Sequence, residues 1–128
     1  MTSLRLGGVL LAAAALLSVA FTSTAAADIP QSSVTLTVHS DQGQVDTVRL
    51  HCAPDGGSHP AAGVACAELK AAGGDFAELG EQGVACTMEL RPVTARASGV
   101  WDGEPLRWRQ EFSNPCMLGA ATGTVFDF

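Results

Sequence analysis

The stretch VTLTVHSDQGQVDTVRLHC, residues 34–52, predicts a β-hairpin at the start of the fold. Residues 34–39 alternate apolar and polar side chains with period two, which is typical of a strand with one buried face. Residues 47–52 repeat the alternation, and the polar segment 41–44 between them predicts a turn. The two strands are therefore expected to pair with each other.

Helical signals follow the hairpin. Pro60 suits the first turn of a helix, residues 61–72 are expected to form that helix, and the glycines at 73–74 end it. Asp75 is expected to cap a short helical turn at 76–79. The sequence therefore places its helical structure in the middle of the chain.

Further strands are expected after residue 93. Residues 94–97 predict a strand that the pair Ser98-Gly99 interrupts, and Asp102-Gly103 is a strong hairpin-turn dipeptide. Residues 106–112 alternate again and predict the next strand, and 124–128 read as a last short strand after a break at 114–116. Strands on both sides of a central helix predict an α+β fold with an antiparallel sheet.

The first 27 residues predict a secretory signal peptide. Arg5 is the single charge, residues 6–20 are almost wholly apolar, and Ala25–Ala27 supply the small residues of a cleavage site. An apolar run of about 15 residues is shorter than the roughly 20 that span a bilayer, so a membrane anchor is not expected. Cleavage would leave residues 28–128 as one secreted domain, and the loss of Arg5 would change the net charge from −6 to −7.

Composition and charge restrict the classes of function. A chain of 128 residues is expected to form one domain. Acidic residues outnumber basic ones by 13 to 7, and the basic residues between Arg49 and Arg109 look too scattered to form a basic patch. A nucleic-acid partner is therefore not expected, because phosphate backbones are bound by basic patches.

Four cysteines lie in the predicted mature domain: Cys52, Cys66, Cys86 and Cys116. An even number of cysteines in a small exported chain predicts two disulfides, for which three pairings are open. If neighbours pair, the chain-entropy model gives each bond roughly 3–4 kcal/mol. This would stabilise a domain with a small core.

Metal and catalytic sites are not expected. His51 and His59 lie near two of the cysteines, but the spacing matches no zinc motif. No Gly-x-Ser-x-Gly segment is present, His39 and His51 fall on polar strand faces, and paired cysteines offer no nucleophile. We therefore expect neither a cofactor nor an enzyme.

The segment GVACTMELRP, residues 83–92, stands out because it has no sustained periodicity. Cys86 and Pro92 both restrict such a loop and lower the entropy that it would lose on binding. Taken alone, Met88 would be interpreted as a core residue, since methionine is usually buried.

From about Val34 to the end, the chain resembles the Streptomyces subtilisin inhibitor family. The matching motifs occur in the family's order: LHCAP (50–54), SHPAAGVACAEL (58–69), GGDF (73–76), CTM (86–88), PV (92–93), GVWDG (99–103), FSNPC (112–116) and VFDF (125–128). The resemblance implies a secreted inhibitor of subtilisin-type serine proteases. It also implies an antiparallel sheet of about five strands with two helices on one side, a homodimer joined through the sheets, and disulfides Cys52–Cys66 and Cys86–Cys116.

The resemblance also assigns a reactive site. It places the scissile bond between Met88 and Glu89, in a reactive loop that further includes Ala85, Cys86, Thr87, Leu90 and Arg91. Asn114 is expected either to support the loop backbone or simply to form a turn. The family commonly has proline before the residue at Met88 and a β-branched residue after it, so Thr87 and Glu89 depart from the pattern.

Two alternatives stay open. An inhibitor of the same fold could act on trypsin-like proteases or metalloproteases. A non-inhibitory secreted protein, such as a transglutaminase substrate, would use exposed glutamines, for which Gln31, Gln42 and Gln44 are the candidates.

Overall fold

The computed structural model describes residues 7–8, 18–24, 28–81 and 83–128. The predicted signal peptide, residues 1–27, lies for the most part outside the described residues. Among the residues that are described, no helix combines the length and apolar character that crossing a membrane requires.

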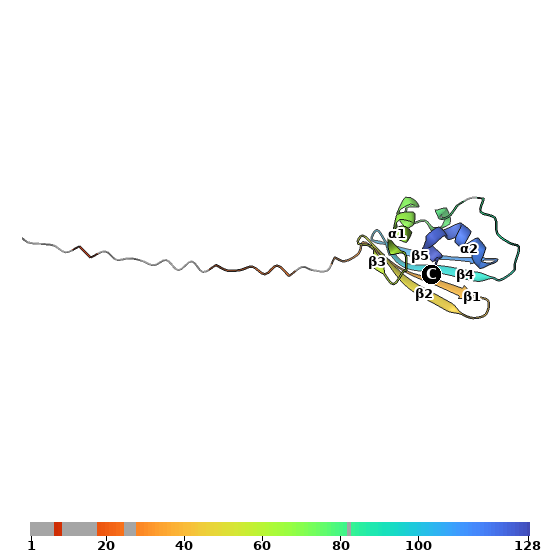
Figure 1. The fold of residues 1–128 in the computed structure, drawn as a ribbon, viewed down its shortest axis with the longest axis horizontal. Coiled ribbons are helices and arrows are strands. Elements are labelled where there is room, and N and C mark those ends of the chain that lie inside the picture. Colours follow the sequence, from red (N-terminus) through yellow and green to blue (C-terminus); the bar gives the residue numbers. More distant parts are fainter. Residues whose placement is uncertain (1–6, 9–17, 25–27, 82) are drawn as a thin grey trace, which may run out of the picture.

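A five-stranded antiparallel sheet forms the body of the domain (Figure 1). The strands lie in the order β3-β2-β1-β4-β5. Their bounds are β1 Ser32–Ser40, β2 Val45–Cys52, β3 Gly56–Gly57, β4 Val93–Trp101 and β5 Glu104–Phe112. The predicted hairpin is confirmed, because β1 and β2 pair along almost their whole length.

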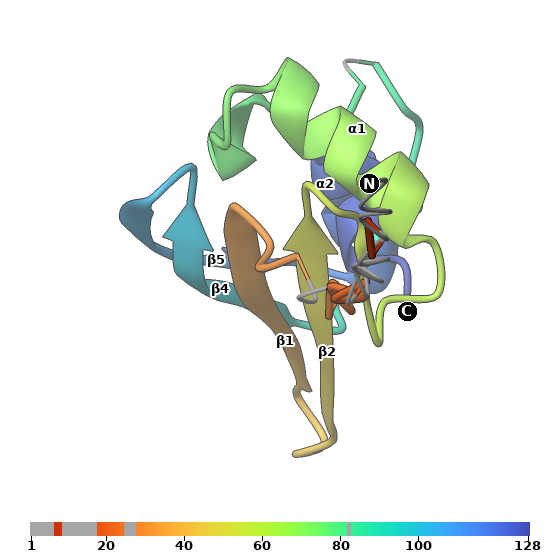
Figure 2. The same cartoon turned by 90° about the vertical axis from the view of Figure 1, so that its left-hand side faces the viewer.

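The helices cover one face of this sheet (Figures 1 and 2). They are α1 Ala62–Ala71, the short 3-10 helix η1 Phe76–Glu78, α2 Pro115–Thr122 and the 3-10 helix η2 Gly123–Phe126. The core lies between the two layers and is built from inward strand residues such as Leu36 and Leu50, with Leu69 from α1 and Leu118 from α2. The predicted α+β class, with two helices on one side of the sheet, is confirmed.

The ends of the predicted central helix are close to those expected. α1 begins at Ala62, so Pro60 lies before the N-cap residue Ala61 rather than in the first turn. Gly73 and Gly74 follow the helix with positive φ angles of 63° and 78°. The Asp75 carboxylate then accepts a hydrogen bond from the amide of Ala77, as expected for the cap of η1.

The predicted interruption of β4 at Ser98-Gly99 is wrong, because the strand continues through both residues. Gly99 has φ +149°, and a Cβ atom at this position would clash with the carbonyl oxygen of Ser33 on β1. Glycine therefore allows two strands to approach closely instead of ending one of them. The turn at Asp102-Gly103 is confirmed, and both residues have positive φ, as a type I′ hairpin turn requires.

The C-terminal end differs most from the sequence prediction. Residues 114–116 do not simply break the chain, because α2 begins at Pro115 with Asn114 as its N-cap residue. Residues 123–126 form η2 rather than a strand, with Val125 and Phe126 buried. Phe126 packs against Trp108 on the helix side of β5. A 3-10 turn buries both consecutive apolar side chains against this layer, whereas a strand would direct them to opposite faces.

Candidate functional site

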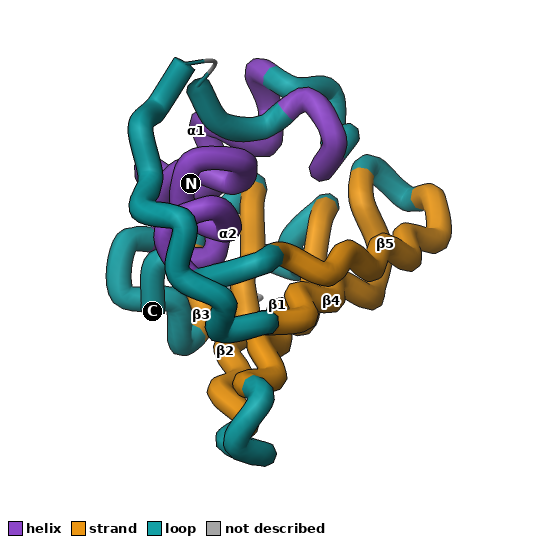
Figure 3. The backbone as a smooth tube through the Cα atoms, turned by 90° about the vertical axis from the view of Figure 1, so that its right-hand side faces the viewer, coloured by secondary structure: helices purple, strands orange, loops and turns teal. Residues whose placement is uncertain are grey.

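One long loop connects η1 with β4, and its residues 83–92 run past α2 (Figure 3). Residues 84–92 form neither helix nor strand. The Met88 side chain is 100% exposed and Leu90 is 77% exposed. The interpretation of Met88 as a core residue is therefore wrong, and its exposure makes the loop a candidate binding element.

A disulfide attaches the loop to the body of the domain. Cys86 is bonded to Cys116, with their Cα atoms 5.8 Å apart. Cys116 lies in the first turn of α2, so the bond joins the loop to a helix that packs on the core. The backbone two residues before Met88 is thus held covalently.

Asn114 holds the loop on both sides of Met88. Its side-chain amide donates hydrogen bonds to the carbonyl oxygens of Thr87, at 3.1 Å, and of Glu89, at 2.8 Å. Its Oδ1 atom accepts a hydrogen bond of 2.9 Å from the amide of Met117 and so caps α2. Asn114 thus bonds to the loop backbone, as the expected support would require, and it caps a helix rather than simply forming a turn.

A fourth attachment lies further along the loop. The amide of Arg91 donates a hydrogen bond of 2.8 Å to the carbonyl oxygen of Ser113, which follows β5. The Arg91 guanidinium also lies 3.8 Å from the Glu89 carboxylate, but both side chains are more than half exposed. An ion pair of this kind contributes little, so backbone attachments and the disulfide hold the loop.

The site therefore presents a peptide whose backbone is held and whose side chains from Thr87 to Arg91 are exposed, Met88 most of all. Attachments at Cys86, Thr87, Glu89 and Arg91 hold the backbone, while Met88 between them reaches into solvent. A loop that is already ordered loses little conformational entropy when a partner binds it. Such a peptide can enter a cleft that accepts extended chains and place Met88 in a pocket.

The second disulfide joins the two cysteines that lie near histidines in the sequence. Cys52 is bonded to Cys66, so the expected pairing of all four cysteines is confirmed. The Asp55 carboxylate lies near these sulfur atoms, but a disulfide has no thiolate to offer a cation. Asp55 instead accepts a hydrogen bond from the amide of Ala53.

The three histidines lie either in the buried interior or on the face of the sheet away from the helices. His59 is buried, its Nε2 atom lies 3.0 Å from the carbonyl oxygen of Val125, and its Nδ1 atom accepts a hydrogen bond from the amide of Ala61. Both ring nitrogens of His59 are thus engaged. His39 and His51 lie on the sheet face away from the helices, as expected for polar strand residues.

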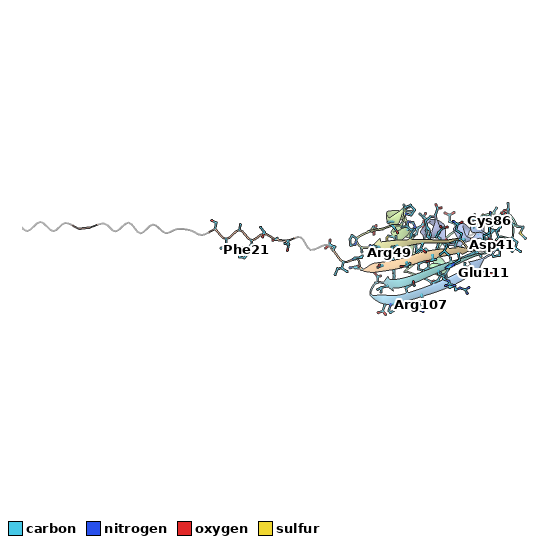
Figure 4. All side chains as sticks on the ribbon, turned by 90° about the horizontal axis from the view of Figure 1, so that it is seen from below. Phe21, Asp41, Arg49, Cys86, Arg107 and Glu111 are labelled. Carbon is cyan, nitrogen blue, oxygen red and sulfur yellow. A yellow bond between two sulfur atoms is a disulfide. The ribbon has the colours of Figure 1, made fainter. Side chains whose placement is uncertain are left out.

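The prediction that the basic residues are too scattered to form a patch is wrong. Arg49, Arg96, Arg107 and Arg109 all point away from the helices, on the uncovered face of the sheet. The strands bring these residues together although they span 61 positions of the sequence. This face lies away from the loop, and Arg107 and Cys86 are labelled at opposite corners of the domain in Figure 4.

The sequence contained a signal for the role of Asn114. An asparagine followed directly by proline is a common start of a helix, because asparagine caps and proline fits the first helical position. The bonds from its amide to the loop join residues 25 and 27 positions apart, and no local pattern predicts them.

Fold and loop together define a small disulfide-bonded scaffold protein that presents one fixed peptide segment. Residues 30–114 match the model of the subtilisin inhibitor-like family. The chain therefore belongs to the subtilisin inhibitor-like family, a family of protease inhibitors and not of enzymes.

Several curated relatives come from Streptomyces. The chain is 48% identical over 83 residues to subtilisin inhibitor-like protein 2 of Streptomyces rochei, a match that covers 63% of this chain and 74% of that protein. It is 45% identical over 84 residues to the transglutaminase-activating metalloprotease inhibitor of Streptomyces mobaraensis, which covers 63% of this chain and 57% of that protein. This chain thus spans little more than half the length of the second relative.

A solved structure shares the fold. It is the crystal structure of Streptomyces caespitosus sermetstatin in complex with Bacillus licheniformis subtilisin. The TM-score is 0.63 at 30% sequence identity, and the match covers 76% of this chain and 98% of that chain.

Proposed function

We propose that this protein inhibits subtilisin-type serine proteases by presenting its loop as a substrate that is cleaved very slowly. The proposed scissile bond joins Met88 to Glu89. The observation that carries the proposal is the pair of hydrogen bonds from Asn114 to the carbonyl oxygens on either side of a fully exposed Met88. The likeness to sermetstatin, whose solved structure holds subtilisin, supports the same class of target.

The chemistry follows from this geometry. The protease serine would attack the Met88 carbonyl carbon, and its proton would pass through the protease histidine to the Glu89 nitrogen as the peptide bond breaks. The new amino terminus at Glu89 would stay close to the acyl group, because the Glu89 carbonyl is bonded to Asn114 and the amide of Arg91 to Ser113. A nucleophile held in place has a high effective concentration, so re-formation of the bond competes with hydrolysis.

The side chains of the loop set the expected preference. Met88 is flexible and apolar and suits a broad hydrophobic specificity pocket. Glu89 places a carboxylate next to the scissile bond and would weaken binding to a protease with an acidic surface there. We therefore expect stronger inhibition of proteases that prefer large apolar residues than of those that prefer basic ones.

The first experiment titrates residues 28–128 against subtilisin, trypsin and chymotrypsin, and sequences the nicked inhibitor formed at low pH. We expect stoichiometric inhibition of subtilisin and one nick after Met88. Met88→Lys should transfer inhibition to trypsin. Leu90→Lys is the matched control, because Leu90 is an exposed apolar residue of the same loop and should not cause the transfer. Rapid complete digestion, or transfer by Leu90→Lys alone, would contradict the proposal.

A metalloprotease is the second candidate target. The observation that favours it is the name of the Streptomyces mobaraensis relative, a transglutaminase-activating metalloprotease inhibitor. Adding a thermolysin-type enzyme to the titration tests this target. A complex that still forms with Met88→Lys would indicate a second contact surface.

The proposal also covers secretion of the protein and its oligomeric state. We propose that residues 1–27 are a signal peptide and that the secreted domain of residues 28–128 forms a homodimer. Amino-terminal sequencing of the exported protein tests the first point, and an amino terminus other than Asp28 would move the cleavage site. Sedimentation velocity tests the second.

A further inference from the structure

The face of the sheet opposite the helices takes no part in the proposed inhibitory loop. We call the outward positions of β2, β1, β4 and β5 the outer face. It contains four arginines, Arg49, Arg96, Arg107 and Arg109, and one carboxylate, Glu111. The outer face thus has three net positive charges in a domain whose total charge, from residue 28 onward, is −7.

Strand register determines how the arginines lie. Arg49 is opposite Thr35, Thr35 is opposite Ser98, and Ser98 is opposite Arg107, so one row crosses four strands with an arginine at each end. The hydroxyl groups between these arginines are hydrogen-bond donors. The row therefore offers donors along its whole length.

The next row contains an unfavourable pair. Arg96 and Arg109 are directly opposite each other on β4 and β5. Like charges at directly opposite positions of a sheet repel. Among the residues that the structure describes, neither forms an ion pair with a carboxylate, since the one salt bridge joins Arg91 and Glu89. An anion bound between the two guanidinium groups would remove this repulsion.

A hollow lies at this point of the outer face. Its volume is about 660 Å³. Three arginines contribute to its lining, which consists of Thr35, Thr37, His39, Arg96, Ala97, Ser98, Arg107, Trp108 and Arg109. Guanidinium groups bind phosphate and sulfate oxygens in paired hydrogen bonds. The outward positions of these four strands contain neither Phe nor Trp, and Trp108 of the lining stacks with Phe76 on the helix side of the sheet.

The same charges oppose pairing of two copies through this face. Four strands of four outward residues cover roughly 500 Å² per copy, and about 1,000 Å² in total is the lower limit for a specific interface. A two-fold interface brings each patch against its own copy, so three net positive charges would meet three more. With so small an area, electrostatics decides whether the pair forms.

We propose that the arginine hollow binds a multivalent oxyanion, phosphate or sulfate, and that occupied hollows allow two copies to pair through the outer face. This inference rests on the proposed homodimer. Anions that bind only the pair shift the equilibrium toward it by mass action. One anion site at ten times its dissociation constant strengthens the pair about tenfold.

The test is sedimentation velocity of residues 28–128 in chloride alone and in chloride with 10 mM sodium sulfate, at equal ionic strength. We expect sulfate to lower the dimer dissociation constant at least tenfold. The double variant Arg96→Gln with Arg109→Gln should lose this effect and pair equally in both salts. Lys70→Gln removes one positive charge from α1, away from the outer face, and should behave like the unmodified protein.

Several results would overturn the inference. One is an equal dissociation constant in the two salts, and another is a sulfate effect that the double variant keeps, which would indicate a general salt effect. Calorimetric binding of sulfate to a chain that stays monomeric, or monomers under every condition, would also overturn it. A further sample with linear polyphosphate at the same phosphate concentration shows whether the hollow prefers a polymer to a free ion. Tighter binding of the polymer to monomers would contradict pairing.

Two controls separate folding and function from pairing. Thermal unfolding shows whether the double variant folds. The single variant Arg107→Gln provides a second, independent measurement of how sulfate changes the dimer dissociation constant. Subtilisin titration of the same samples shows whether inhibition fails separately from pairing. A protein that pairs as expected but does not inhibit would contradict the proposed function and leave this inference standing.

Discussion

Asn114→Ser separates the two roles of Asn114 and tests the proposed mechanism most directly. Serine is as good an N-cap residue as asparagine, so the bond to the amide of Met117 can be kept. The amide that donates to the carbonyl oxygens of Thr87 and Glu89 is lost. Each intramolecular hydrogen bond contributes about 1 kcal/mol net, so about 2 kcal/mol of loop stabilisation should disappear.

The expected consequence is a weaker inhibitor that is cleaved faster. A loss of 2 kcal/mol in the ordering of the loop corresponds to an inhibition constant for subtilisin about 30-fold higher. The assay measures this constant by tight-binding titration and the rate of cleavage after Met88 by mass spectrometry. Both should rise, because the loop leaves its bound conformation more often and the new amino terminus is held less firmly.

Asp75→Ala is the matched control for loss of a helix cap. The Asp75 carboxylate caps η1 and makes no hydrogen bond to the reactive loop. Its loss should cost about 1 kcal/mol of global stability and leave the inhibition constant unchanged. An Asn114→Ser protein with an inhibition constant within threefold of the original and no faster cleavage would refute the role assigned to Asn114.

Three further changes test other parts of the structure. Replacing both Cys86 and Cys116 by serine opens a loop of 30 residues, which the chain-entropy model values at about 3.5 kcal/mol; urea unfolding should show this loss, and subtilisin should digest the variant. Gly99→Ala places a methyl group against the Ser33 carbonyl oxygen of β1 at φ +149°, so calorimetry should show a melting temperature lowered by about 10 °C or more. An unchanged melting temperature would contradict the observed close approach of the two strands. Glu89→Gln removes a surface ion pair with Arg91; the free energy of unfolding should change by less than about 0.5 kcal/mol, while the inhibition constant for a protease with an acidic surface beside the scissile bond should fall.

Local patterns predicted most of the secondary structure. The period-two alternation of residues 34–39 and 47–52 corresponds to β1 and β2, and the turn at Asp102-Gly103 lies where expected. These predictions hold because alternation and turn conformation depend on neighbouring residues. The predictions are wrong where contact with another strand determines the conformation. At Gly99 this contact is with a carbonyl group on β1.

The candidate loop was partly predictable. A segment without periodicity, bounded by Gly83 and Pro92 and containing a cysteine, indicates a restrained loop. Its exposure was not predictable from local patterns, because the usual burial of methionine favours a core position for Met88, and only the family resemblance placed this residue in a reactive loop. Only the packing of α2 shows that this side chain extends into solvent while the backbone beside it is attached to Asn114.

By itself, the sequence determined the α+β class, a four-cysteine domain and the family motifs that single out Met88 and Glu89. The tertiary structure decided which atoms hold the loop, how the C-terminal end folds, and that four separated arginines share one face. The physical reason is the range of the interactions. Alternation, caps and turns act over a few residues, whereas the amide bonds of Asn114 and the clustering of the arginines require strands and helices far apart in sequence to meet.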